Sequence, residues 1–523
     1  MIKFDSKIVR VSVSAWALAL ALSYGMVAQA EYDLVLKGGR VIDPESGLNA
    51  IRDVAIRGDM IVEISELSLQ GKETIDVSGK IVSPGFIDIH THSPTPLGQY
   101  HQVMDGTTTA LELEAGSYPI KEYGVDIRQQ PLINFGSSAG YINMRILQKQ
   151  GIKLAHIAGS PTPVGVKGYW TAFMSLMSEQ RQAFEEQADE QDLKELQALL
   201  ADGLKQGGLG IGLALDYMSE GVDATEMRMI FDTAAAHDSI IFVHMRRGVN
   251  GDPAGLHEVL DLVRQTGVSL HICHIQHNAM RNIDLFLKEI ANARSEGLDV
   301  TTELLPFNAG SAAISSAVFG RNWQEIFDIS YEDVEWAATG ERFTEKSWNE
   351  KRINNPQGQV IHHYVKEEWT RRALVEPGVI IVTDLLPMMT RDSKVAPHNA
   401  AFTKVLSHYV RETSLLDIET AIKKMTLLPA MRLEKVAPGF KKKGRLQVGA
   451  DADITVFDPE LVKDNATYAD PYRTADGISL VIVNGTPVVR EGELVENTYP
   501  GREILGQTLP PKSTTLADEN ESN

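Results

Sequence analysis

Two pairs of ionisable residues that could take part in catalysis or metal binding lie at the ends of strand-like apolar runs. His90 and His92, one residue apart, follow the apolar run 86–89. Alternate side chains of an extended chain point to the same side, so both imidazoles face one way. Histidines paired in this way can also serve only local hydrogen bonds. Glu112 and Glu114 close a second run with two carboxylates on one face, which is costly to bury unless a cation or a proton compensates.

Three further apolar runs also end in an ionisable residue, namely His244, His274 and Asp384. Neutral imidazoles and carboxylates are together the ligands that Zn²⁺ and similar divalent transition metals prefer. The set therefore predicts a metal centre holding one or two zinc ions, with another divalent transition metal as the alternative. The remaining histidines of the folded elements are expected to be surface or packing residues: His237, His257, His408 and His271.

Eight strand-like apolar runs position these residues, and helical stretches alternate with them. Such alternation predicts a closed parallel (β/α)8 barrel, because each parallel connection needs a crossover. An open doubly wound sheet is the alternative, but no glycine-rich phosphate loop follows the first run. In barrel enzymes the reactive groups lie where the strands end. The eight runs are 86–89, 108–113, 132–135, 209–215, 240–243, 268–273, 298–305 and 379–382.

Short alternating strands separated by turns occur near both ends of the chain. This sequence pattern predicts a small discontinuous β-sandwich formed by residues 31–85 and 436–505, with the catalytic barrel at 86–435 between them. A lid-like insertion is expected at about 306–372, and residues 506–523 are expected to form a flexible tail. The insertion carries four of the six tryptophans: Trp323, Trp336, Trp348 and Trp369.

The first thirty residues have the pattern of a secretory signal peptide. Lys3, Lys7 and Arg10 precede an apolar run at 11–26, and the segment ends in small residues at Ala30. A membrane anchor is the competing interpretation, but the run falls short of the ~20 residues needed to span a bilayer. We therefore expect cleavage after Ala30, no membrane span in the mature chain, and a secreted or periplasmic protein.

The overall composition favours a small-molecule partner. The chain has 50 lysine and arginine residues against 70 aspartate and glutamate residues, a balance that should repel nucleic acid and anionic membranes. Cys273 is the only cysteine, so no intramolecular disulfide can form and stability must come from packing. The composition leaves the oligomeric state open.

Three sequence segments resemble the amidohydrolase superfamily, in the branch of the N-acyl-D-amino-acid deacylases and nearest to the D-glutamate deacylases. They are Ser-Pro-Gly-Phe-Ile-Asp-Ile-His-Thr-His at 83–92, Asp-Gly-Thr-Thr-Thr at 105–109, and the glycine-rich segment at 443–454. The resemblance covers nearly the whole mature chain. It implies that Asp384 is the general acid/base and that the insertion is a mobile flap over the substrate. It also implies metal ligation by His90, His92, His244 and His274.

The ligand set departs from the pattern of D-aminoacylases in one place. They have a bridging cysteine where a gapless comparison puts Ala115, and Glu114 is one step away. We expect Glu114 to take the bridging place, with Glu112 as the alternative. Other amidohydrolases use a carboxylated lysine after the fourth strand, but residues 210–216 contain no lysine.

Substrate recognition departs as well. The lysine that usually lies two residues beyond the sixth-strand histidine is Gln276, so one anchor for a substrate carboxylate is missing. Arg391 and Lys394 are candidates for the arginine expected after Asp384. Two residues just past strands, Tyr217 and Arg246, are also placed to bind a substrate oxygen or carboxylate.

The expected activity is hydrolysis of the amide bond of an N-acyl or peptide-linked amino acid, with a D-residue favoured by the resemblance. A metal-activated water would attack the carbonyl, and the tryptophans of the insertion would cover an apolar acyl or aromatic group. A dipeptidase, a prolidase-like enzyme and a cyclic amide hydrolase remain alternatives. A non-catalytic periplasmic scaffold is the alternative from outside the enzymes.

Overall fold

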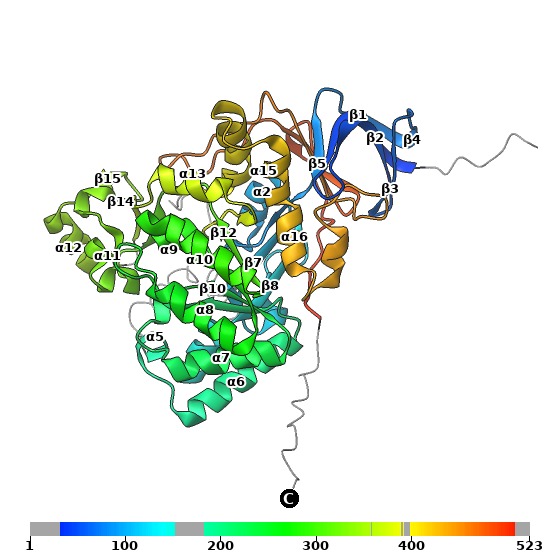
Figure 1. Cartoon of the computed structure of the whole chain (residues 1–523). Coiled ribbons are helices and arrows are strands. Elements are labelled where there is room, and N and C mark those ends of the chain that lie inside the picture. The colour runs from blue at the N-terminus through cyan, green and yellow to red at the C-terminus, as the bar shows by residue number, and fades with distance from the viewer. Residues whose placement is uncertain (1–31, 152–181, 357, 389–390, 392–397, 508–523) are drawn as a thin grey trace, which may run out of the picture.

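The structure is a computed structural model that describes residues 32–151, 182–356, 358–388, 391 and 398–507. A central barrel carries a small β-domain at one end and an inserted subdomain at the other side (Figure 1). The predicted signal peptide at 1–30 lies outside the described residues, as does nearly all of the predicted tail at 506–523. Within the described ranges, no helix combines the length and the apolarity needed to cross a bilayer.

Eight parallel strands among the described residues form the barrel, in the order β17-β12-β11-β10-β9-β8-β7-β6. Each contains residues of one of the eight predicted runs, which confirms the barrel. Both faces of these strands are buried, and this is why they appear in the sequence as continuous apolar runs rather than as alternating ones. The strands are β6 (Phe86–Asp88), β7 (Thr107–Ser117), β8 (Asn134–Gly140), β9 (Ile211–Ala214), β10 (Ile240–His244), β11 (Ser269–Ile272), β12 (Val300–Leu304) and β17 (Val379–Ile381).

The barrel closes between β17 and β6, and it does so just beyond the ends of both strands. The amide of Asp384 donates to the carbonyl of His90 at 2.9 Å, and the amide of His92 donates to the carbonyl of Leu385 at 2.8 Å. The buried Asp88 carboxylate also accepts the amide of Thr383 at 3.2 Å. Closure therefore brings the first and last candidate site residues side by side.

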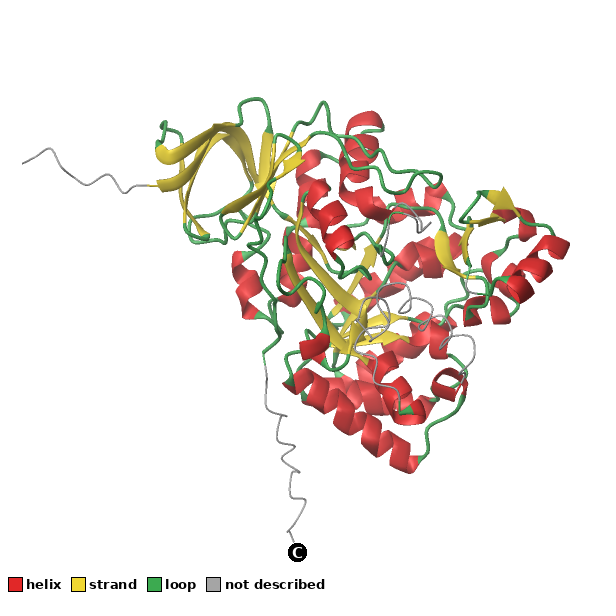
Figure 2. Cartoon of the chain, turned by 180° about the vertical axis from the view of Figure 1, so that it is seen from behind, coloured by secondary structure: helices red, strands yellow, loops and turns green. Residues whose placement is uncertain are grey.

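Helices surround the strands, as the red ribbons around the yellow sheet in Figure 2 show. An exception is the connection from β7 to β8, where the described helix is the short 3-10 segment η1 (Ile120–Glu122). The barrel helices are α2 (Pro96–Met104), α3 (Tyr141–Gln150), α5 (Gln182–Glu185), α6 (Glu190–Lys205), α7 (Ala224–Ala236), α8 (Ala254–Thr266), α9 (Ile275–Ala279), α10 (Ile283–Ser295) and α13 (Glu367–Val375). After β17 come α14 (Ala401–Lys404), the π-helix η7 (Val405–Glu412), α15 (Ile418–Met425) and α16 (Leu427–Leu433).

Helix α6 illustrates how the sequence specifies this packing. The Asp189 side chain accepts hydrogen bonds from the amides of Gln191 and Asp192, so the helix begins with a side-chain cap. Its buried face includes Leu196 and Gly203. A Cβ at Gly203 would lie 2.9 Å from the side chain of Ala139 in β8, so glycine permits the close approach of helix to strand.

Strands from both chain ends form the small β-domain, as predicted. Nine strands of the described chain make one sheet, in which β5 pairs with β1 on one side and with β18 on the other. The buried pair β5 and β18 thus joins the two halves of the domain. The strands are β1 (Tyr32–Asp43), β2 (Leu48–Arg57), β3 (Met60–Ser65), β4 (Gly71–Asp76), β5 (Ile81–Pro84), β18 (Ile454–Phe457), β19 (Ile478–Val483), β20 (Thr486–Arg490) and β21 (Glu493–Leu494).

The insertion between β12 and β17 is a small subdomain whose packed aromatic residues are continuous with the hydrophobic core of the barrel. Its described strands form a sheet in the order β13-β16-β14-β15, at the left of Figure 1. The rings of Trp323 and Trp348 lie 4.9 Å apart, and Phe319 packs against Trp348 at 5.2 Å. The elements are β13 (Gly310–Ala313), α11 (Trp323–Phe327), β14 (Val334–Trp336), β15 (Glu341–Arg342), α12 (Glu345–Asn354) and β16 (Gln359–His362).

Candidate metal centre

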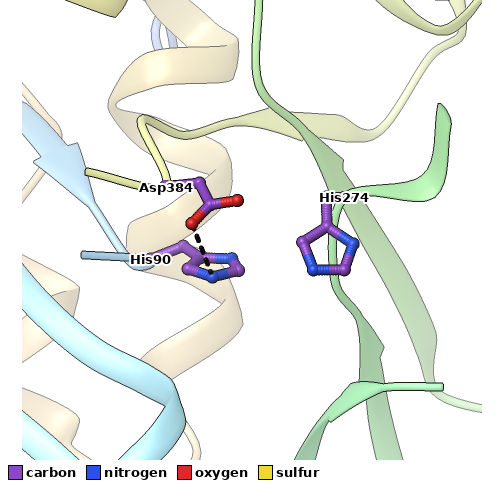
Figure 3. Close-up of side chains that lie close together, drawn as sticks. All are labelled: His90, His274 and Asp384. Atoms are coloured by element: carbon purple, nitrogen blue, oxygen red, sulfur yellow. Dashed lines mark ion pairs between the residues drawn. The ribbon is translucent and has the colours of Figure 1, made fainter. Parts of the chain in front are cut away.

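The candidate ligands converge at the carboxyl ends of the barrel strands. His90 follows β6, Glu114 lies within β7, His244 is the last residue of β10, and His274 precedes α9. Asp384 lies three residues beyond β17. Figure 3 shows the side chains of His90, His274 and Asp384 around one common space.

Glu114 lies between two pairs of histidines. Its Oε1 is 2.9 Å from Nδ1 of His244 and 2.8 Å from Nε2 of His274. Its Oε2 is 3.4 Å from Nε2 of both His90 and His92. The ligand atoms of each pair and the shared carboxylate lie within 4.8 Å of one another, which forms two adjoining three-ligand sets. A carboxylate shared by two ligand sets can hold two metal ions side by side.

Outer carboxylates orient the first histidine pair. Nδ1 of His90 contacts Oε1 of Glu303, and Nδ1 of His92 is 2.7 Å from Oε2 of Glu112. When the Nδ1 protons are donated to these carboxylates, both Nε2 atoms present lone pairs to each other at a separation of 3.3 Å. Such a cluster of buried acceptors is unfavourable without a cation or added protons. The donor set therefore fits a divalent transition metal.

Asp384 completes the site beside His90 and His92. Its Oδ1 is 3.3 Å from Nε2 of His92 and 3.6 Å from Nε2 of His90. Burial alone raises the pKa of the Asp384 carboxyl, but His90 and His92 outweigh burial and bring the pKa below its ordinary range. The group is therefore a carboxylate at neutral pH and can accept a proton.

The backbone is strained at two of these residues. His274 has a φ of 30° and Asp384 has a φ of 49°, both in the left-handed region that side chains rarely adopt. Each such residue costs about 1–3 kcal/mol and persists only where the surrounding structure enforces it. The carbonyl of Asp384 accepts a hydrogen bond from Nδ1 of His398 at 2.7 Å, which helps to hold this conformation.

Glu112 and Glu114, the two carboxylates of β7, occupy different positions in the site. Glu112 lies behind His92, and its Oε1 accepts the amides of Ala115 at 3.0 Å and Gly116 at 3.4 Å. Glu114 reaches the space between the histidine pairs. The expectation that Glu114 is the bridging group thus agrees with the geometry, whereas Glu112 contacts the ligand set from outside.

One buried carboxylate of this centre, that of Glu303, was not predicted from the sequence. Glu303, near the end of β12, contacts His90 with one oxygen and Nε2 of His271 with the other at 2.9 Å. His271 in turn is 2.7 Å from the Thr301 hydroxyl through Nδ1. Burial alone raises the pKa of Glu303, but His90 and His271 lower it to about 2. The signal in the sequence was the one carboxylate within the strand Val-Thr-Thr-Glu-Leu, near its end.

A cavity of about 100 Å³ opens beside the candidate ligands. Tyr217 lines it, as expected, with its ring 5.3 Å from that of His244. Three segments of the insertion also contribute to the wall. Its lining includes Ala309, Gly310, Ser311, Ala312, Val318, His362 and Tyr364.

Arg246 is directed away from this cavity, contrary to expectation. Its Nε donates to Oε2 of Glu258 at 3.0 Å, and its terminal nitrogens donate to the carbonyls of Ser219 at 2.7 Å and Val222 at 2.6 Å. These contacts occupy the guanidinium outside the cavity. The next residue, Arg247, lines the cavity in its place.

The other predicted substrate contacts are not part of the described cavity wall. Arg391 lies over the ring of Tyr100 at 5.9 Å, and Lys394 lies outside the described residues. Gln276 is buried and donates to the carbonyl of Leu305 at 2.5 Å. The four tryptophans of the insertion are buried within the protein, and none of them is among the residues that line the cavity. The expectation that they cover an acyl group is therefore wrong.

The fold and sequence both have known relatives. An N-acyl-D-glutamate deacylase from Alcaligenes xylosoxydans xylosoxydans is 30% identical over 491 residues, covering 88% of this chain and 94% of that protein. A D-aminoacylase from the same organism is 30% identical over 500 residues, covering 91% and 98%. A solved N-acyl-D-glutamate deacylase from Bordetella bronchiseptica, complexed with zinc and a phosphonate inhibitor, matches with a TM-score of 0.70 and 24% identity, covering 91% of this chain and 100% of that one.

A family model matches a range that includes three of the six candidate residues of the site. The model described as the amidohydrolase family matches residues 166–489, which include His244, His274 and Asp384. The remaining ligands, His90, His92 and Glu114, precede the matched range, and the two curated relatives cover 88% and 91% of this chain. The chain belongs to the amidohydrolase family.

Proposed function

We propose that this protein is a metal-dependent hydrolase that cleaves the amide bond of an N-acyl-D-amino acid. The observation that carries the proposal is the shared Glu114 carboxylate between two histidine pairs, with Asp384 facing the same space. The deacylase names of the two 30% identical relatives support the substrate class. A substrate entering the adjoining cavity would place its amide beside these groups.

Zinc is the metal that we propose, held by His90, His92, Glu114, His244 and His274. Bound zinc would supply Lewis acidity toward the amide carbonyl and would lower the pKa of water toward about 7. The protein contributes the orientation of the ligands. Glu303 and Glu112 fix the Nδ1 side of His90 and His92, which leaves the Nε2 atoms directed into the centre.

Asp384 would act as the general base and then as the general acid. Its carboxylate is positioned to orient the attacking water and to accept its proton. The same group would then protonate the departing amine, because an amide nitrogen leaves very slowly as an anion.

A substrate panel tests the proposed function. The zinc-loaded protein is expected to hydrolyse N-acetyl-D-amino acids with a higher kcat/KM than their L-enantiomers, measured by release of the free amine. The panel includes acidic and apolar side chains, L,L-dipeptides and cyclic amides. Turnover of the L-configured substrates alone would contradict the proposal and would favour a dipeptidase-like enzyme.

We also propose that the chain is exported and cleaved after Ala30, on the basis of the basic, apolar and small-residue succession at its N-terminus. The full-length chain is expected to give a mature protein that begins at Glu31. Intact-mass measurement of protein from the cell-envelope fraction checks this. Recovery of protein that still carries residues 1–30 would remove the support for export.

A further inference from the structure

Arg247 places a buried cation in the wall of the substrate cavity. Its side chain is only 7% exposed, yet it lines the same cavity as His92, Glu114 and Asp384. The residue lies in the loop that follows His244, at the end of β10. A charged group so deeply buried needs a partner of opposite charge.

Asp216 is the carboxylate nearest to Arg247, but both of its oxygens already accept hydrogen bonds from a second arginine. Arg321, from the insertion, donates to Asp216 with two nitrogens at 3.0 and 2.9 Å. The side chain of Arg247 reaches Asp216 only at 3.5 Å, through Nη1. One carboxylate set against two guanidinium groups leaves a net positive charge in this three-residue cluster.

The guanidinium of Arg247 is also held in place, although not all of its N–H groups donate a hydrogen bond within the described residues. Its amide donates to Oδ1 of Asp216 at 3.0 Å, and the guanidinium lies 5.6 Å from the ring centre of Phe327 in α11. Among the described residues, its Nε has no hydrogen-bond partner. Barrel and insertion together thus hold a guanidinium that has a free donor and an unbalanced charge.

Two residues of the insertion also line this cavity. Gly310 and Ala312 of β13 line the cavity with little or no side chain. Together with Arg247 they define a small polar space that opens onto the metal centre. A planar anion can pair with a guanidinium through two parallel hydrogen bonds, which an ammonium cannot match.

We infer that Arg247 binds the carboxylate of the substrate and that Asp216 and Arg321 position the Arg247 side chain. Arg247 would thus supply the positive charge that the uncharged Gln276 lacks. This inference rests on the proposed function. It specifies the substrate as an acylated amino acid whose carboxylate is free. The insertion thereby contributes to substrate recognition through Arg321 and Phe327.

Matched substrates and variants test the inference. The assay compares the best N-acetyl-D-amino acid of the panel with its α-carboxamide, which has the same shape without the charge. In Arg247→Met, kcat/KM for the acid is expected to fall by about 10²–10³-fold, mostly through KM, because a charged hydrogen-bonded pair is lost. For the carboxamide it is expected to stay within about threefold of wild type. Arg247→Lys should give an intermediate loss for the acid because it keeps the charge but not the fork.

Two controls separate the possible failures. Arg228→Met removes a cation from the exposed face of α7, where Arg228 pairs with Asp232, and is expected to leave both rates unchanged. The carboxylate role would be overturned if the wild type is active and the Arg247→Met variant loses kcat/KM equally for the acid and for the carboxamide. A wild type that hydrolyses no N-acetyl-D-amino acid would instead overturn the proposed function, and this inference with it.

Discussion

Replacing Asp384 with asparagine is expected to lower kcat by about two to four orders of magnitude, because the amide cannot accept a proton from water or return it to the leaving amine. Asparagine has nearly the same shape, and the barrel-closing hydrogen bond of residue 384 comes from the backbone amide. The fold and the metal content should therefore remain close to those of wild type. Steady-state kinetics with zinc in excess and metal analysis of the same preparation measure the two effects separately.

Two results would change the role of Asp384. Near-normal kcat in the Asp384→Asn variant would remove the residue from proton transfer. A loss of metal that parallels the loss of activity would assign Asp384 to the ligand set, since its Oδ1 lies within 3.6 Å of the Nε2 atoms of His90 and His92. Circular dichroism and thermal unfolding show whether the variant is folded.

Removing the shared carboxylate should have the largest effect on metal binding. Glu114→Ala takes away a group that contacts four histidines and supplies the negative charge between them. Changes to outer partners of metal ligands typically weaken binding by about 10–100-fold, so loss of this shared ligand is expected to exceed 100-fold. Turnover should fall with metal content. Competition with a chelator, followed by metal analysis, measures the affinity.

Glu112→Gln is the matched control for this experiment, because Glu112 lies on the same strand and contacts His92 from outside. Its metal affinity is expected to fall by about 10–100-fold, and its activity should recover when zinc is in excess. His274→Ala removes one donor and should lower both metal content and turnover. Equal metal affinity in the Glu114→Ala and Glu112→Gln variants would contradict the bridging assignment.

The barrel could be predicted because burial on both faces makes its strands continuous apolar runs. The boundaries were less accurate where small or polar residues fill the strand. The third strand was expected at 132–135 but runs from Asn134 to Gly140 through glycine and serine. A pattern based on apolar residues ends too early there, because close approach to neighbouring strands and helices selects small side chains instead.

The convergence of the candidate ligands could be predicted because each lies near or just beyond the end of a barrel strand, whereas their partners depend on contacts between distant parts of the chain. Glu303 contacts His90 across 213 residues, and no local pattern connects them. The choice between Arg246 and Arg247 also escaped prediction. Both lie in an irregular loop, where sequence spacing does not determine which side chain faces the cavity.

The tryptophans of the insertion show the same limit. Their number indicated an aromatic surface for a substrate, but the subdomain needs a core and uses large aromatic side chains to fill it. Composition revealed that the segment has something to bury. It could not show whether the buried faces meet a ligand or one another.

The β-domain has a consequence for the order in which the chain folds. Strand β5 pairs with β18, and 369 residues separate the end of one (Pro84) from the start of the other (Ile454). During synthesis, β5 can pair with β1 on one side, but it lacks its partner on the other side until almost the whole chain has left the ribosome. Contacts of such long range slow folding, and unpaired edges invite association with other chains. Strands β18 to β21, which are synthesised last, thus complete the domain whose first strands are synthesised first. A truncation that removes them would leave β5 as an open edge of the sheet.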